Sequence, residues 1–226
     1  MTDLGRRAWP DVDCAVVLLP VGSLEQHGPH LPLDTDTRIA VAVADGVAAA
    51  VGDAVVAPPL AYGSSGEHEG FPGTVSIGRE ALAAVLVEAG RSASSWARRL
   101  VFVNGHGGNV DVVRDAVRLL ADEGRDASWI PCAPGAGWEI DAHAGRAETS
   151  LLLHLAPETV RLDRAEPGET APIGEILPRL VAGGVRAVSA NGVLGDPSGA
   201  TAEEGGRLLA AMVGAGLARL DAGIRP

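Results

Sequence analysis

Short apolar runs alternate along this chain with longer segments whose apolar residues recur at helical spacing. The apolar runs carry no charge, which is typical of strands buried on both faces, and they span residues 14–19, 54–57, 100–103 and 127–130. The segments with helical spacing lie between and after them, at 36–51, 79–98 and 110–123. This alternation predicts an α/β fold in which helices cover both faces of a mainly parallel central sheet.

Length and charge narrow the class of protein. The chain has 226 residues, which suits a single domain over residues 1–226. Its net charge is -11, and its 18 basic residues are all Arg, so clustered cations for nucleic acid or an anionic membrane are not expected. No signal peptide or membrane-spanning run is recognisable, and Cys14 and Cys132 are expected to be buried thiols. A cytoplasmic protein is therefore expected.

Two chemistry-bearing motifs follow predicted strands. GSLEQHGPHLPLDTD, at 22–36, places Glu25 and His27 on the same side of an extended segment, since side chains alternate with period two. Asp36 opens the next helix, and its two oxygens could bridge two metal ions. The alternative is a helix-capping Asp36 and a solvated Glu25. The Gly- and Pro-rich setting at a strand end favours a metal site.

The second motif, NGHGGN, follows the strand at 100–103, and the carboxyl ends of parallel strands share one edge of a sheet. His106 is its one strong candidate metal ligand. A third motif, DAHAGRAETS at 141–150, offers Glu148 as a final ligand and His143 as an acid–base group. For this third motif, a dipole-stabilised carboxylate and a surface histidine remain an equal alternative.

A Gly-rich loop at 62–74 carries Glu67 and His68 and suits the rim of a site. His68 is expected to contact either the substrate or the loop itself. Motifs of other enzyme classes are absent from the sequence: there is no G-x-S-x-G elbow and no phosphate-binding P-loop pattern.

At these motifs the chain resembles the creatininase family. Four blocks carry the resemblance, in order from residue 20 to residue 150: PVGSLEQHGPHLPLDTD, EHEGFPGT, NGHGGN and HAGRAETS. The resemblance implies a three-layer α/β/α creatininase-like fold, a two-metal site, hydrolysis of amide bonds, and homo-oligomers. It implies that Glu25, His27, Asp36 and His106 are metal ligands, with Asp36 bridging, and that His143 is the catalytic histidine.

One block departs from the creatinine-hydrolysing members. Their second motif looks like NGHYEN, in which the acid is a metal ligand, whereas Gly108 stands at that position here. Glu148 is therefore the candidate replacement ligand, and creatinine becomes a less favoured substrate. Trp138 lies near the place of an aromatic lid residue, with a slightly different spacing to His143. Glu67, His68 and Trp138 are the candidate substrate contacts.

Within the family, three blocks look most like the mycofactocin-system peptidase branch, and they are YGSSGEHEGFPGT, HAGRAETS and NGVLGDPSGAT. Peptidases of that branch trim a C-terminal Val-Tyr dipeptide from a radical-modified precursor peptide. We therefore expect a metal-dependent amide or peptide hydrolase with two divalent ions, Zn, Fe or Mn. The alternatives are hydrolysis of creatinine, another cyclic amide or a formamide, and a non-catalytic scaffold that binds a peptide.

Overall fold

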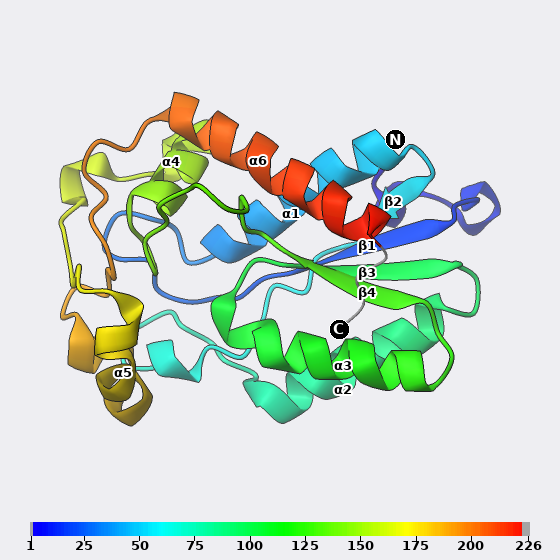
Figure 1. The fold of residues 1–226 in the computed structure, drawn as a ribbon, viewed down its shortest axis with the longest axis horizontal. Helices are drawn as coiled ribbons and strands as arrows, with labels where there is room; N and C mark the ends of the chain where they lie inside the picture. The colour runs from blue at the N-terminus through cyan, green and yellow to red at the C-terminus, as the bar shows by residue number, and fades with distance from the viewer. Residues whose placement is uncertain (1, 223–226) are drawn as a thin grey trace.

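A four-stranded parallel sheet is the centre of the fold (Figure 1). The structure is a computed structural model and describes residues 2–222. The strand order is β2-β1-β3-β4. The strands are β1 (Val16–Val21), β2 (Ala54–Val56), β3 (Arg99–Asn104) and β4 (Ala127–Pro131). The expected parallel sheet is confirmed.

Helices cover both faces of this sheet, which gives the expected three layers (Figure 1). One face carries α1 (Thr35–Val51), α4 (Arg146–Leu155) and α6 (Ala202–Asp221), which contact one another. The other carries α2 (Gly78–Ala93) and α3 (Val110–Asp122). Helix α5 (Ile173–Val188) lies beyond the end of the sheet. The 3-10 turns are η1 (Leu4–Arg6), η2 (Trp9–Asp11), η3 (Gly66–His68), η4 (Gly107–Asn109), η5 (Pro157–Thr159) and η6 (Leu162–Arg164).

The core is divided in two by the sheet, because successive strand residues point to opposite faces. Leu18 of β1 packs in the cluster formed with α1, α4 and α6. Its neighbours Val17 and Leu19 pack with α2 and α3. A strand that is buried on both faces must be apolar throughout, which is why the strands are visible in the sequence as uninterrupted apolar runs.

Several expected boundaries shift. Strand β1 was expected to end before Pro20, but it continues to Val21 because the Pro20 carbonyl still accepts a hydrogen bond, from the Leu60 amide at 2.9 Å. Helix α2 ends at Ala93, and the Ser94 hydroxyl then bonds to the Gly90 carbonyl at 2.7 Å.

Cys14 and Cys132 are free cysteines, and each residue is partly buried. Burial raises the pKa of both thiols, most strongly that of Cys132, so the expected burial holds for the Cys132 thiol and only in part for that of Cys14. Helix α6 begins with a side-chain cap, in which the Thr201 hydroxyl accepts the Glu204 amide at 3.1 Å.

Strand register places the first two motifs side by side. Val21 and Asn104 are direct neighbours at the carboxyl ends of β1 and β3, so the segments that follow them start from the same edge. Helix α5 and the turn η3 lie at this end of the molecule (Figure 1). Among the described residues, no helix is long and apolar enough to cross a membrane.

Candidate metal centre

The carboxylates and imidazoles of the first two motifs converge at this edge. Glu25 and His27 follow β1, His106 follows β3, and Asp36 lies in the first turn of α1. All four residues are at least 95% buried, with exposed fractions of 0%, 0%, 5% and 2%, respectively. The extended segment after β1 therefore does direct the Glu25 and His27 side chains toward one centre.

Asp36 lies between the two imidazoles. Its Oδ1 is 3.1 Å from Nε2 of His27, and its Oδ2 is 3.3 Å from Nδ1 of His106. The same His106 nitrogen is 3.2 Å from Oε2 of Glu25. One carboxylate thus faces two separate groups of nitrogen and oxygen atoms, which is the arrangement that a bridging ligand requires.

The buried acids fit a cation. Both oxygens of Glu25 and Oδ2 of Asp36 are buried without a hydrogen-bond partner, since the nearby imidazole nitrogens are not in hydrogen-bonding geometry. A buried carboxylate that accepts no hydrogen bond is costly, whereas imidazole and carboxylate atoms together are suitable ligands for a divalent ion. Ligand atoms of Glu25, His27 and Asp36 all lie within 4.8 Å of one another. This cluster can therefore hold a metal ion.

The third motif joins the same centre from the start of α4. Oε2 of Glu148 is 4.0 Å from Nε2 of His27 and accepts the Ala144 amide at 2.6 Å. Glu148 thus lies on the His27 side of the cluster. His143 is buried, and its ring centroid is 4.4 Å from that of His27. More than 100 residues of sequence separate His27 from His143 and Glu148, and the packing of α4 on α1 brings them together.

Burial and charge act in opposite directions on the imidazoles. Burial by itself would lower the pKa of His27, but the Asp36 and Glu148 carboxylates outweigh it and raise that pKa to about 10. His106 has a raised pKa for the same reason, with Glu25 and Asp36 as its partners. Burial lowers the pKa of His143 well below its ordinary value, and the neighbouring His27 adds to this. His143 is therefore a neutral imidazole at pH 7.

Gln26 supports His68 and His143 and was not recognised in the sequence. Its side-chain amide donates to the Gly192 carbonyl at 3.0 Å and contacts Nδ1 of His68 at 2.9 Å. The Nε2 of His143 donates to the Gln26 carbonyl at 2.7 Å. No local spacing signalled this role, because His68 and His143 lie 42 and 117 residues away from Gln26 along the chain.

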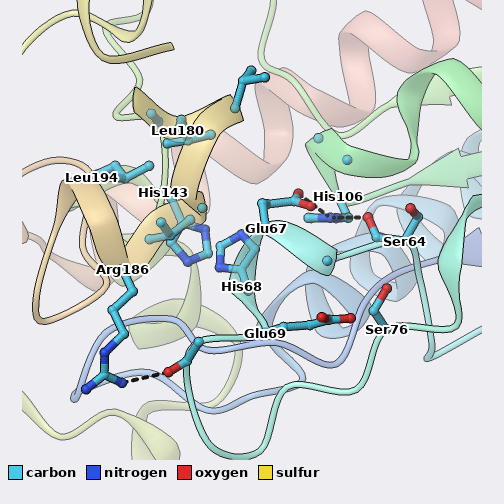
Figure 2. Close-up of a pocket in the computed structure, with 18 of the residues that line it drawn as sticks. Ser64, Glu67, His68, Glu69, Ser76, His106, His143, Leu180, Arg186 and Leu194 are labelled. Carbon is cyan, nitrogen blue, oxygen red and sulfur yellow. Dashed lines mark hydrogen bonds and ion pairs between the residues drawn. The ribbon is translucent and has the colours of Figure 1, made fainter. Parts of the chain in front are cut away.

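A cavity of about 1050 Å³ opens onto the cluster, with Asp36, His106, His143 and Glu148 in its lining. Figure 2 shows Glu67 and His68 entering it from η3, next to His106 and His143. His68 is buried, with Nε2 3.2 Å from Oε1 of Glu25, so it belongs to the cluster.

Trp138 lies elsewhere: it packs against the core that α1, α4 and α6 form, and the residues lining this cavity do not include it. The structure therefore gives no contact between Trp138 and the described cavity.

Comparison with known proteins places the chain in a family. A family model described as creatinine amidohydrolase matches residues 6–220. The mycofactocin precursor peptide peptidase of Mycolicibacterium smegmatis is 62% identical over 203 residues, which cover 88% of this chain and 81% of the relative. Two solved creatininase structures, a variant of the Zn–Zn type and a manganese form, each align with a TM-score of 0.78 at 30% identity, over 100% of this chain and 99% of theirs.

These likenesses extend over the sheet, its helices and all three motifs. The α/β fold, the shared strand edge and the buried acid–histidine cluster are those expected of a metal-dependent hydrolase. The chain therefore belongs to the creatininase family of metal-dependent hydrolases, in which its peptidase and creatinine amidohydrolase relatives act on C–N bonds.

Proposed function

We propose that this hydrolase is a peptidase that removes the C-terminal Val-Tyr dipeptide from a modified precursor peptide. The observation that carries the proposal is a buried acid–histidine cluster in the lining of a cavity of about 1050 Å³. The name of the Mycolicibacterium smegmatis relative, a mycofactocin precursor peptide peptidase, supports the same substrate.

The cavity walls suit a peptide. Ile173, Leu177 and Val181 of α5 line it, although they are 49%, 48% and 79% exposed. Their spacing of four residues puts them on one stripe of the helix, and apolar side chains of a bound peptide would cover that stripe. A small ring such as creatinine would leave most of this volume and apolar surface in contact with water, which favours the larger substrate.

Two groups of residues would hold two metal ions. Glu25 and His106 would hold one together with Asp36, and His27 and Glu148 would hold the other, so Asp36 belongs to both groups. When bound, a divalent cation supplies Lewis acidity, which activates water and polarises the carbonyl of the scissile bond. Zn, Fe and Mn all accept such mixed carboxylate and imidazole ligands.

His143 would move the proton. Because its Nε2–H is held by the Gln26 carbonyl, its Nδ1, 3.9 Å from Oε1 of Glu25, is the nitrogen that can accept a proton from water and pass it to the departing nitrogen. Its lowered pKa keeps that nitrogen unprotonated at neutral pH. The Gln26 contact also fixes the orientation of the ring.

The decisive experiment incubates the metal-replete protein with the modified precursor peptide, its unmodified form and creatinine. Mass spectrometry should detect release of Val-Tyr, and Glu25→Gln should abolish the release together with metal binding. Hydrolysis of creatinine without dipeptide release would establish the small-ring alternative. Tight peptide binding without any cleavage would establish the non-catalytic scaffold. Assembly into a homo-oligomer stays a prediction, which light scattering after size-exclusion chromatography would check.

A further inference from the structure

The two nitrogens of the His106 ring face different surroundings. Nδ1 faces the acids of the cluster, with Oε2 of Glu25 at 3.2 Å and Oδ2 of Asp36 at 3.3 Å. Nε2 faces away from them, toward the Ser64 carbonyl at 3.2 Å and Oε1 of Glu67 at 3.4 Å, as Figure 2 shows. Because Nδ1 is the nitrogen directed at the metal cluster, Nε2 is the one that must carry the proton and needs an acceptor.

Gly108 leaves the space that the Glu67 carboxylate occupies. A Cβ atom on Gly108 would lie 2.6 Å from Oε1 of Glu67 and 2.5 Å from Nε2 of His106. It would also lie 2.5 Å from the Ser64 carbonyl oxygen, which is backbone and cannot rotate away. A side chain at position 108 and the observed contact between Glu67 and His106 therefore exclude each other.

A second glycine makes room for the backbone of the same residue. Gly184 of α5 has φ of 69°, and a Cβ there would lie 2.6 Å from the Glu67 carbonyl oxygen. The backbone of α5 is kinked at this glycine, whose φ and ψ are not helical, and α5 packs directly on η3. Gly108 thus lies close to the Glu67 side chain, and Gly184 lies close to the Glu67 backbone. The packing of these two segments fixes the position of the Glu67 carboxylate.

We propose that Glu67 is a positioning residue for the metal ligand His106, and that Gly108 is required because it leaves room for this contact. The Glu67 carboxylate and the Ser64 carbonyl accept the Nε2–H of His106. They thereby hold the ring orientation and make Nδ1 a stronger ligand, as carboxylate partners of metal-bound histidines do. The inference deepens the proposed function, on which it rests, and it replaces the expected role of Glu67 as a substrate contact.

Zinc affinity tests this role without any substrate. We would measure the Zn²⁺ dissociation constant by chelator competition for wild type, Glu67→Ala, Glu67→Gln and Glu69→Ala. Glu69 is the matched control, since it has the same charge, lies two residues away and lines the same cavity. Loss of such a partner is expected to weaken metal binding about 10–100-fold in Glu67→Ala. Glu67→Gln, whose amide oxygen can still accept, should be intermediate, and Glu69→Ala should match wild type.

Gly108→Ala provides a second, independent variant. Its added methyl group should displace the Glu67 carboxylate and weaken Zn²⁺ binding, whereas Gly107→Ala, whose Cβ would meet nothing within 4 Å, should not. Circular dichroism of the metal-free proteins would establish that each variant is folded. Glu67→Ala binding Zn²⁺ as tightly as Glu69→Ala, or changing only KM for a peptide, would overturn the inference. Failure of the wild type to bind metal would instead overturn the proposed function itself.

Discussion

Replacing Gly105 with Ala should destabilise the protein and loosen the metal cluster together. Gly105 connects β3 to His106, and its backbone passes directly over the first turn of α1. A Cβ at this position would overlap the Asp36 carbonyl oxygen and lie 3.2 Å from the carbonyl carbon. It would also lie 3.3 Å from the Ala40 Cβ. Gly105 is not among the residues with positive φ, so the effect of the added methyl group is purely one of space.

The loss of stability in Gly105→Ala depends on the atoms that the added methyl group contacts. Overpacking a filled site typically costs about 1–3 kcal/mol, and the upper end applies here because a backbone carbonyl in a helix cannot rotate away. For a chain of this length, about 3 kcal/mol corresponds to a melting temperature lowered by roughly 6–12 °C. The same displacement moves Asp36, whose side chain lies between His27 and His106, so Zn²⁺ affinity should also fall.

Gly107→Ala is the matched control, two residues further along the same segment. A Cβ there would meet nothing within 4 Å, so its free energy of unfolding should change by no more than about 0.5–1 kcal/mol, in the stabilising direction if at all. Urea unfolding should be measured with a chelator present, because bound metal would add its own stabilisation. Equal free energies of unfolding for the two Ala variants would refute the reasoning from close approach.

Three further predictions concern the reaction and its metal. His143→Ala should lower turnover about 10²–10⁴-fold at unchanged metal content, and loss of metal in this variant would make His143 a ligand instead. Because the raised pKa of His27, about 10, keeps its proton in the metal-free protein, Zn²⁺ binding at pH 8 should release that proton. Calorimetry in buffers of different ionisation enthalpy would measure the release, and zero protons would contradict the prediction. Arg79 lines the cavity, and its ion pair among residues 2–222 is a 4.0 Å contact with Asp111, so Arg79→Gln should raise KM for a peptide with a free C-terminal carboxylate but not for its C-terminal amide.

Sequence reasoning succeeded wherever one local pattern had one physical cause. Strands buried on both faces must be apolar along their whole length, so all four strands could be predicted within two residues at each end. The spacing of Glu25 and His27 also had one physical cause. Side chains alternate along an extended backbone, so these two side chains were expected on the same side. The extent of helix α5 is harder to predict, because a glycine and a proline normally end a helix, whereas here the helix contains Pro178 and continues past the kink at Gly184 to Val188.

The sequence by itself determined the α/β class, the parallel sheet and the edge at which Glu25 and His106 meet. These depend on apolar periodicity and on the common direction of parallel strands, both of which are local properties. Only the tertiary structure decided which side chains touch. It placed Glu148 beside His27, Glu67 beside His106 and Gln26 between two histidines, and it packed Trp138 against the core, away from the cavity. Such contacts join residues far apart in the chain, and they depend on how whole elements pack, which no local spacing encodes.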